Sequence, residues 1–503
     1  MKYIPTIGIE CHVQLATKTK LFSEVDNDAR GKEPNACVSP VDYALPGMLP
    51  RLNGEAVKLA IRAGRAMNCK INNFSRFDRK HYFYPDSPKG YQITQFYQPI
   101  IGEGYVELPN GSRVRIEHAH LEGDAGKLTH FADYSLVDLN RVDTPLIEIV
   151  SQPDIHSAKD AHDYCKELWR LMTFSGVSYG DLYNGNMRFD INVSLAPEGS
   201  KKLGTRTETK NLNSFRSVER AVEYEIARQI KLLDAGEKIV QETRGWSDDA
   251  GKSTSQRSKE EAKDYRYMPE PDLPPLNLSD EFIETEAAKL PLMPADYRVK
   301  FGGMIKPEIL EILLDYPTLM EKLNELSAEN EPSETVPREP HEASEASEAR
   351  DDGPERAGSR KVVLALISNL FTSVLLAEQK SAEYLNDLPS AEDLSELAEM
   401  NEKKELSSTA TKEVFLKLFD PQMKGRGAKA IAKELGLIQE NDLGALEAIV
   451  DAVLKKPETQ KAQDDYRAGE EKVIGFLVGQ VMKESKGKAN PSAVQEILRQ
   501  KLA

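Results

Sequence analysis

The sequence predicts a mixed α/β body followed by two helical regions, and three observations support this division. The chain has 503 residues, which is more than one hydrophobic core usually organises, so several domains are expected. Up to about residue 276, short segments of alternating polarity are interrupted by glycine and proline, whereas the later sequence has helical periodicity almost throughout. The composition changes again near residue 407. We therefore predict domains at 1–290, 291–406 and 407–503.

Charge is distributed unevenly along the chain. The formal net charge of −16 argues against a protein that coats nucleic acid generally, because such proteins are basic. Residues 327–359 carry ten acidic and three basic residues, with Val336 as the only large aliphatic side chain, so we predict a disordered insert there. Without this insert the body is much less acidic, and a local RNA-binding surface is compatible with its charge.

Targeting signals and a disulfide framework are not expected. The sequence predicts no membrane span, and the first residues, MKYIPTIGIE, enter a strand-like alternation without a signal or transit peptide. The four cysteines form no CxxC pair, which argues against a zinc knuckle. We expect a soluble cytoplasmic protein.

The first predicted strand, IGIECHVQL, has one apolar face and one reactive face. Alternation places Glu10 and His12 on the side opposite Ile9 and Cys11. Such a pair suits a divalent cation or proton transfer, but a solvated polar face on an edge strand is the more common explanation of an isolated E-x-H. This segment alone leaves both interpretations open.

The same design recurs in four more predicted strands, RIEHAHLEGDAGKLTH, TPLIEIV, MRFDINVSL and TRTETKNLNSF. A purely structural sheet would present Thr, Lys and Glu on its open face, whereas these strands present imidazoles, amides, guanidinium groups and carboxylates beside glycine turns. We therefore predict a sheet whose open face is a polar cleft. The last segment then enters a helix, with Ser214 as N-cap, that ends near Gly236. The polar faces carry His118, His120, Glu122, Asp124, Glu148, Arg188, Asp190, Asn192, Ser194, Arg206, Glu208 and Lys210.

A further stretch, DRKHYFYPDSPKGYQITQF, combines cations with tyrosines. It suits contact with phosphates or bases, and a tyrosine-rich loop packed on the core explains its composition equally well. No P-loop, GxGxxG or GxSxG motif is present. A nucleotide, if one is used, is therefore held by another architecture.

Taken in order, these motifs resemble one known family. The sequence is similar to the B-subunit family of bacterial tRNA-dependent amidotransferases. The motifs that carry this resemblance are IGIECHVQL, DRKHYFYPD, LEGDAGK, TPLIEIV, RFDINVSL, TKNLNSF and DYRYMPEPDL, followed near the C-terminus by IGFLVGQVMKESKGKANP. The resemblance is dense over residues 3–280, loose in the connector, and good from about 408 to 503. It implies an α+β fold, in which an N-terminal cradle with a central antiparallel sheet and flanking helices precedes an all-α connector and a small helical tRNA-binding tail.

The resemblance also implies an enzyme and its partners. ATP phosphorylates the side-chain carboxylate of Glu-tRNA(Gln) or Asp-tRNA(Asn), and ammonia then displaces the phosphate. The ammonia comes from an amidase (glutaminase) A subunit, and a small C subunit completes a heterotrimer. The implied cofactors are ATP and Mg²⁺, in a glutamine-hydrolysing carbon–nitrogen ligase.

Site residues are implied position by position. Glu10, His12 and Glu148 correspond to the Mg²⁺ site, and Lys80 corresponds to a contact with the substrate carboxylate or phosphate. The remaining catalytic candidates share the same predicted cleft. These are Glu122, Asp124, Arg206, Glu208, Lys210 and Asn211.

The chain departs from the family pattern at three places. The family usually has two acidic residues where this chain has Glu122 and Gly123, and the second is associated with the metal site. Val142 and Asp143 stand where a small residue before Thr is commoner, and Phe189 stands where Cys is common. If Gly123 weakens the activation site, the alternative is a tRNA-binding assembly subunit. A free-standing ATP-dependent ligase of small carboxylic acids is a third possibility.

Basic residues cluster in the tail. Lys483, Lys486 and Lys488 lie around a break before Pro491, where a positive turn beside a helix N-terminus suits a phosphate contact, although a solubilising turn has the same composition. Lys424 and Arg426 are placed to serve a similar purpose. We predict tRNA contact at these five residues.

Overall fold

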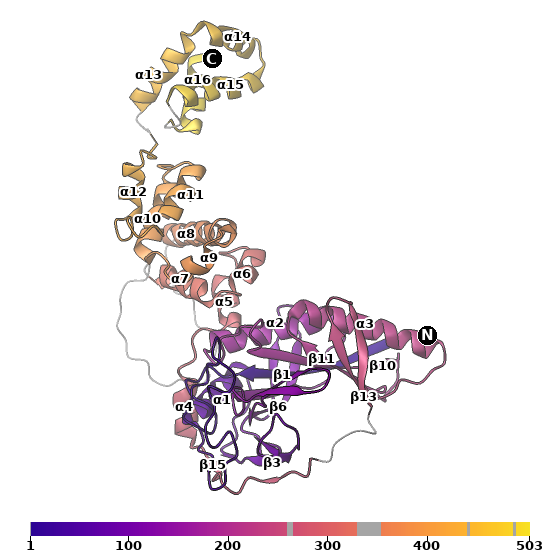
Figure 1. Cartoon of the computed structure of the whole chain (residues 1–503). Coiled ribbons are helices and arrows are strands. Elements are labelled where there is room, and N and C mark those ends of the chain that lie inside the picture. Colours follow the sequence, from indigo (N-terminus) through magenta and orange to yellow (C-terminus); the bar gives the residue numbers. More distant parts are fainter. Residues whose placement is uncertain (1, 259–264, 329–353, 440–442, 486–488, 503) are drawn as a thin grey trace. The chain divides into compact units, whose positions relative to one another are not determined.

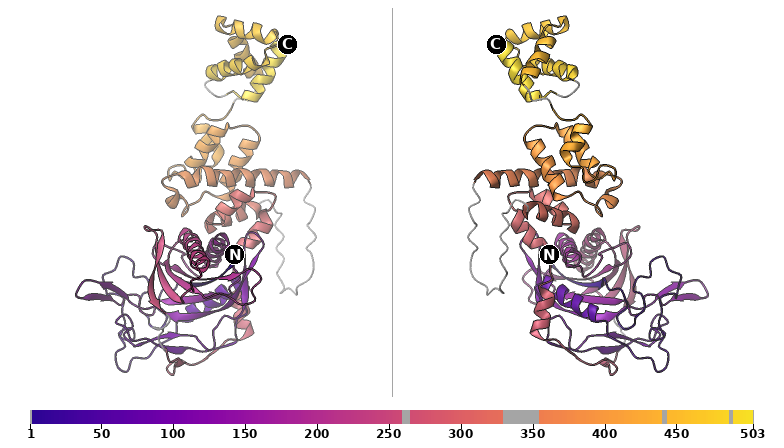
Figure 2. Two further views of the ribbon diagram at one scale, coloured as in Figure 1. Left: turned by 90° about the vertical axis from the view of Figure 1, so that its right-hand side faces the viewer. Right: turned by 90° about the vertical axis from the view of Figure 1, so that its left-hand side faces the viewer.

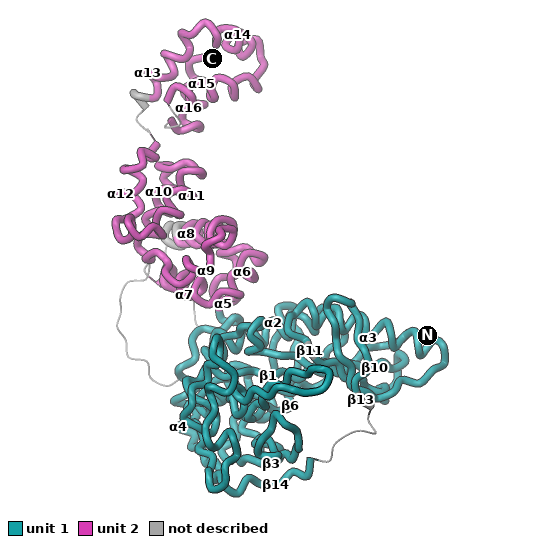
Figure 3. Tube along the Cα trace, in the orientation of Figure 1, with its two compact units in different colours: residues 1–296 teal, residues 297–503 magenta. Residues whose placement is uncertain are grey.

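Two compact units make up the chain. The computed structural model describes residues 2–258, 265–328, 354–439, 443–485 and 489–502, and it divides into residues 1–296 and 297–503 (Figure 3). The division lies beside the predicted boundary at 290, whereas the boundary at 407 stays a prediction. Most of the predicted insert 327–359 falls outside the described residues. Its two ends are helical, because they belong to the helices α7 and α8 that flank it.

The first unit combines strands with a few helices. Its strands are β1 (Tyr3–Gln14), β2 (Phe74–Ser75), β3 (Asp78–His81), β4 (Tyr91–Thr94), β5 (Gly104–Glu107), β6 (Arg113–Gly123), β7 (Lys127–His130), β8 (Ser135–Asp138), β9 (Pro145–Ser151), β10 (Met187–Pro197), β11 (Thr207–Leu212), β12 (Glu242–Ser247), β13 (Lys252–Ser258), β14 (Met268–Pro269) and β15 (Leu276–Asn277). Its helices are α1 (Gly54–Ala66), α2 (Ala158–Phe174), α3 (Phe215–Asp234) and α4 (Asp280–Ala287).

The central sheet has eight strands in the order β13-β12-β11-β10-β1-β9-β6-β5 (Figure 1). Each neighbouring pair is antiparallel except β11 and β12, which run parallel. The predicted α+β class with a central antiparallel sheet is therefore confirmed, with one parallel pair that the sequence did not indicate. A smaller three-stranded sheet has the order β14-β3-β4.

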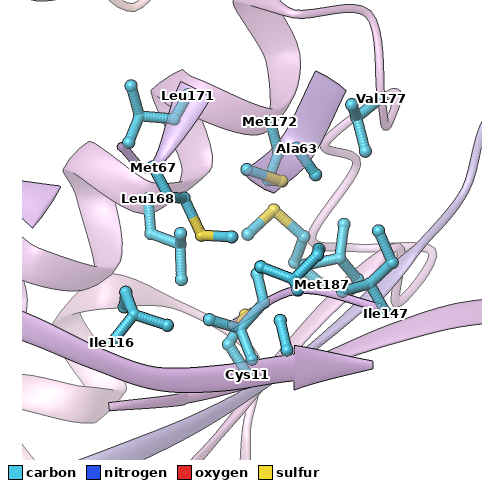
Figure 4. Packing of buried hydrophobic residues seen from close by; sticks show 14 of the residues in the cluster. Cys11, Ala63, Met67, Ile116, Ile147, Leu168, Leu171, Met172, Val177 and Met187 are labelled. Atoms are coloured by element: carbon cyan, nitrogen blue, oxygen red, sulfur yellow. The ribbon is translucent and has the colours of Figure 1, made fainter. Parts of the chain in front are cut away.

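The alternation of apolar and polar residues predicted for β1 is confirmed, and its apolar residues form part of the hydrophobic core. Ile7, Ile9, Cys11 and Val13 are at most 1% exposed. Helices α2 and α3 pack side by side on this apolar face (Figure 2). Figure 4 shows Cys11 among the packed side chains that the strands and helices contribute. Burial of this apolar surface fixes which face of the sheet remains open to carry polar groups.

Helix α3 begins and ends where the sequence predicts. The side chain of Ser214 accepts a hydrogen bond from the backbone N–H of Ser217, which satisfies one free donor of the first turn. After Asp234 the chain leaves the helix through Gly236, whose φ of 76° lies in the left-handed region. The predicted N-cap is therefore confirmed.

The regular elements of the second unit are helices, and its described residues form no named strand. One hydrophobic cluster within it is formed by residues 446–502 of the last four helices. The helices are α5 (Pro294–Phe301, which begins at the unit boundary), α6 (Pro307–Leu313), α7 (Pro317–Ala328), α8 (Pro354–Ser373), α9 (Ser381–Tyr384), α10 (Ala391–Glu402), α11 (Ser408–Lys417), α12 (Ala428–Glu434), α13 (Leu443–Leu454), α14 (Pro457–Arg467), α15 (Ile474–Glu484) and α16 (Pro491–Leu502), with short 3₁₀ turns at Leu375–Ala377 and Glu471–Val473.

One segment is long and apolar enough to cross a membrane, which the sequence did not lead us to expect. It is the window Arg360–Ala377, which begins within α8, and 44% of it is buried inside the protein. Leu364, Ile367 and Phe371 have no exposed surface. Length and composition alone are weak grounds for a membrane span, since a core helix has the same properties.

Candidate functional site

Strand pairing aligns four polar residues in one row across the central sheet. His120 of β6 lies opposite Glu148 of β9, Glu148 lies opposite His12 of β1, and His12 lies opposite Arg188 of β10. Directly opposed residues on one face of a sheet are close enough for their side chains to interact. An acidic neighbour on one strand and a basic neighbour on the other therefore flank the imidazole of His12.

Three side chains converge at this row into a candidate metal centre. The Nε2 atom of His12 lies 3.5 Å from Oε1 of Glu122 and 3.4 Å from Oε2 of Glu148. One ligand atom from each residue can be chosen so that all lie within 4.8 Å of one another. Two carboxylates and one imidazole fit a divalent cation whose remaining ligands are water or phosphate oxygens.

Glu122 occupies the place in this cluster that we expected for Glu10. The carboxylate of Glu10 instead accepts a hydrogen bond from Nδ2 of Asn192 at 3.0 Å and lines a second cavity of about 420 Å³. Burial and the nearby charges of Glu148 and Glu208 raise the pKa of Glu10. The candidate metal cluster among the described residues is thus His12, Glu122 and Glu148, and a role of Glu10 as a ligand stays a prediction.

Electrostatics set the protonation of the cluster. Although burial alone would lower it, the hydrogen bond to Glu148 and the charge of Glu122 raise the pKa of His12 to about 9. Burial opposes ionisation of Glu148 too, but its contact with His12 and the charges of His120 and Lys80 hold its pKa well below the ordinary range. Without a metal, the site therefore holds an imidazolium between two carboxylates.

This protonation predicts a pH-dependent metal affinity. Because the pKa of His12 is raised to about 9, its stabilising charge is fully present below pH 6.5 and is lost as pH rises through 9. A metal needs the neutral imidazole, so between pH 7 and 8 the apparent affinity for Mg²⁺ or Mn²⁺ should rise about tenfold, with release of one proton. Calorimetry in buffers of different ionisation enthalpy measures both quantities. His12→Asn should abolish the pH dependence of metal affinity. An affinity of the unmodified protein that does not change between pH 7 and 8 would contradict the prediction.

A cavity of about 650 Å³ lies beside the cluster, between the polar face of the central sheet and the three-stranded sheet. His12 and Glu122 line it from the central sheet, and Lys80 lines it from β3. The ammonium of Lys80 lies 5.0 Å from the centre of the Tyr265 ring. Among the described residues it has no hydrogen bond or ion pair, so it is available to an anionic ligand.

Lys80 remains charged in this position. Burial disfavours the charged form of Lys80 and would lower its pKa. The nearby groups outweigh this effect, so the pKa of Lys80 is raised; they are Glu122, Tyr267, Glu148 and Tyr265. A half-buried cation near two carboxylates is poised for a ligand that brings negative charge.

The other predicted catalytic residues are more fully paired. Asp124 lies 2.6 Å from Arg141 and 3.4 Å from Arg188, and although burial opposes ionisation, the two arginines lower its pKa. Lys210 lies 2.9 Å from Asp190 and 3.2 Å from Glu208. Asp124 and Lys210 line the larger cavity.

Two predicted residues lie away from that cavity, and one side chain cannot be placed. Arg206 is exposed and lines the second cavity with Glu10. Glu208 accepts a hydrogen bond from the hydroxyl of Thr243 at 2.6 Å. It is connected to the cavity only through its ion pair with Lys210. The side chain of Asn211 lies outside the described part of the structure.

Sequence reasoning gave no specific role to His120, Lys89 or Asp143. Nε2 of His120 lies 3.7 Å from Glu148 and 3.8 Å from Glu122, and its Nδ1 is buried without a hydrogen-bond partner among the described residues. The H-x-H-x-E alternation of β6 was a usable signal for His120. Lys89 and Asp143 form a buried ion pair, and no local pattern joins residues so far apart in the sequence.

The predicted tRNA contacts are dispersed within the second unit. Lys483 is exposed in the last turn of α15. Lys424 is ion-paired with Asp387, and Arg426 lies 2.6 Å from Glu434, outside the hydrophobic cluster of α13–α16. Lys486 and Lys488 lie outside the described residues. The contact with tRNA stays a prediction at all five positions.

Comparisons with known proteins cover both units. Residues 5–284 match the family model described as the GatB/GatE catalytic domain, and residues 355–502 match the GatB domain. The B subunit of the aspartyl/glutamyl-tRNA(Asn/Gln) amidotransferase of Geotalea uraniireducens is 43% identical, with each chain covered completely. The proteins of the same description from Thermodesulfovibrio yellowstonii and Carboxydothermus hydrogenoformans are 42% and 40% identical, over at least 99% of each chain. The chain therefore belongs to the B-subunit family of aspartyl/glutamyl-tRNA(Asn/Gln) amidotransferases.

Proposed function

We propose that this chain activates the side-chain carboxylate of Glu-tRNA(Gln), Asp-tRNA(Asn) or both, and then transfers ammonia to it. It acts as a ligase in the cytoplasm, in a heterotrimer with an amidase A subunit and a small C subunit. The observation that carries the proposal is the cluster of His12, Glu122 and Glu148 beside a cavity that Lys80 lines, in a chain matched over its full length by amidotransferase B subunits.

The residues of the cavity suit the first step. A side-chain oxygen of the aminoacyl group attacks the γ-phosphorus of ATP, the bond from that phosphorus to the bridging oxygen breaks, and ADP leaves. His12, Glu122 and Glu148 would hold Mg²⁺, which when bound would neutralise charge on the phosphate oxygens. Lys80 holds the substrate carboxylate or the transferred phosphoryl group by a charge-assisted hydrogen bond.

The second step needs no further activation by the protein. Ammonia attacks the carbonyl carbon of the acyl phosphate, the carbon–oxygen bond to phosphate breaks, phosphate leaves, and the nitrogen loses a proton. The paired groups Lys210–Asp190 and Asp124–Arg188 surround the reacting region without adding a net charge of either sign. Fixed pairs of this kind orient a substrate at little reorganisation cost.

The interpretation as an assembly subunit with a weakened activation site is not favoured. It rested on Gly123, and the three-residue cluster is complete without a side chain at position 123. Glu122, its neighbour, supplies the carboxylate.

Reconstitution tests the proposal directly. The chain is combined with its A and C partners, ATP, Mg²⁺ and glutamine, and conversion of Glu-tRNA(Gln) and of Asp-tRNA(Asn) is measured by acid-gel analysis. ATP hydrolysis dependent on misacylated tRNA supports the proposal, whereas tRNA binding without such hydrolysis would support the assembly subunit. Equal turnover of free glutamate without RNA would indicate the free-standing ligase.

We expect the last four helices to contribute tRNA affinity. Their hydrophobic cluster is self-contained, so deleting residues 440–503 should leave the rest folded, whereas a cut at 408 would expose the side of α10 that packs on α11 and α12. Loss of phosphate contacts should weaken tRNA binding about tenfold or more at 0.1 M salt and reduce the salt dependence. Fluorescence anisotropy measures both, and Lys472→Ala serves as a surface control for Lys483→Ala. Unchanged affinity after the deletion would contradict the assignment.

A further inference from the structure

Four aromatic rings form a continuous row from the wall of the larger cavity to the protein surface. The row begins at Tyr265, which lines the cavity and whose ring centre lies 5.0 Å from the ammonium of Lys80. The ring centre of Tyr267 lies 6.0 Å from that of Tyr265. Tyr267 stacks on Phe96, with 4.0 Å between the ring centres, and Phe96 meets Tyr97 edge to face at 5.0 Å. The row therefore connects the cation in the cavity with the exterior.

The outer end of the row is exposed on a fixed turn just after β4. Phe96 is 53% exposed and Tyr97 is 57% exposed. The backbone N–H groups of both residues donate to Oδ2 of Asp78, each at 3.0 Å, and Asp78 is completely buried. Contiguous exposed apolar surface of this kind is typical of interaction sites.

The inner end of the row is attached to the strand that carries Lys80. The backbone N–H of His81 donates to the carbonyl of Tyr265 at 2.9 Å, and β14, which begins directly after Tyr267, pairs with β3. Asp78 and His81 are the first and last residues of β3. Because both ends of the row are bonded to this one strand, the rings and Lys80 keep their relative positions.

Two arginines accompany the row. Arg266, which separates the two tyrosines in the sequence, is exposed. The backbone N–H of Arg76 donates to the carbonyl of Gln98 at 3.3 Å, so a second arginine lies close to the outer end in the chain path. Aromatic rings together with cations are the combination with which proteins bind single-stranded nucleic acid, since every base has a π face and the backbone is negatively charged. A duplex fits such rings less well, because its bases are already stacked.

We propose that the unpaired 3′ end of the aminoacyl-tRNA stacks on Phe96 and Tyr97, and that the row of rings guides the esterified amino acid to Lys80. The inference rests on the proposed function for its substrate, because an amino acid esterified to the terminal ribose enters the cavity together with the last bases. The alternative occupant of exposed rings is a partner protein, the A subunit. RNA is favoured because the row leads to the lysine that faces the substrate, and a protein interface does not require that continuity.

A binding cycle in the complete enzyme tests this inference. It uses tRNA(Gln) or tRNA(Asn), whichever binds more tightly, with and without the unpaired 3′ nucleotides. Removal of these nucleotides should weaken binding to the parent about tenfold or more. Phe96→Leu, which keeps an apolar side chain without a π face, should weaken binding of the complete tRNA by a similar factor. The two losses should not add, because they remove the same contact. Phe96→Trp should retain the parental affinity.

A fluorescent base reports stacking directly. The fluorescence of 2-aminopurine in place of the 3′-terminal adenine should fall when the tRNA binds to the parent, and Phe96→Leu should abolish this quenching. Phe131→Leu is the matched control, because Phe131 is 48% exposed and stacks on Tyr134 at 4.7 Å, but neither of these two residues lines the cavity. It should change tRNA affinity by less than about twofold. In amidation, Phe96→Leu should raise KM for the aminoacyl-tRNA about tenfold and leave KM for ATP unchanged.

Three results would overturn the inference. They are a parent that binds truncated and complete tRNA equally, additive losses in the binding cycle, and quenching that survives Phe96→Leu. If Phe96→Leu instead releases the A subunit on size-exclusion chromatography and retains its tRNA affinity, the rings belong to a protein interface. If the parent amidates neither tRNA, the proposed function has failed, and the binding cycle still decides where the 3′ end lies.

Discussion

Glu148→Gln is expected to lower ATP-dependent amidation about a thousandfold while the protein stays folded, because it removes one of the two negative charges of the proposed metal site. Glu148 is central among the strands of the site: it lies opposite His12 on one side and His120 on the other. The amide keeps the shape of the side chain, so packing of β9 is preserved. The loss should appear in kcat, since the metal stabilises charge that develops in the transition state.

The measurement separates loss of metal from loss of fold. Mn²⁺ binding followed by electron paramagnetic resonance should weaken strongly, whereas Tm and tRNA binding should change little. Glu107→Gln is the matched control, because Glu107 is a carboxylate of the same sheet that pairs with Arg113 on the exposed surface. We expect it to retain activity within about twofold. A Glu148→Gln enzyme with near-parental kcat would remove Glu148 from the metal site.

Lys80→Met is expected to lower kcat/KM about a hundredfold, the effect of removing one charged donor from a preorganised site. The methionine side chain has nearly the length of lysine without its charge, so the contact with the tyrosine rings near β3 persists in part. Lys80 has no ion pair in the described structure, and its removal should therefore leave stability almost unchanged.

A control variant and a rescue variant test whether the loss comes from the charge at position 80. Lys127→Met changes an exposed lysine of β7, outside the cavity, and should have no effect on turnover. Lys80→Arg keeps the charge in a larger planar group and should recover part of the activity if a point charge suffices. If Lys80→Met and Lys127→Met behave alike, Lys80 does not contact the substrate.

Much of the fold follows from local sequence signals. The alternation of β1 predicted both its buried face and its polar face, and Ser214 and Gly236 predicted the limits of α3. These features depend on one segment each. Periodicity and capping are local properties, and they are the ones that sequence reveals directly.

The composition of the site required long-range information that one sequence does not hold. Glu10 and Glu122 were both on the correct face of their strands, but only the register between β1, β9 and β6 decides which carboxylate meets His12. The close approach of Gly123 to Asp143 was also hidden, since the two residues belong to different segments of the sequence. Contacts between segments set both outcomes.

The central place of β1 has a consequence for biosynthesis. This strand pairs on one edge with β9 and on the other with β10, and both partners follow it at long distance along the chain. The ribosome must therefore release the chain as far as Pro197 before the middle of the sheet can close. Both edges of this strand are unpaired until β9 is released, and the edge that faces β10 stays unpaired until Pro197. An unpaired strand edge beside an apolar face favours aggregation, so chaperones are expected to protect the nascent chain during this interval.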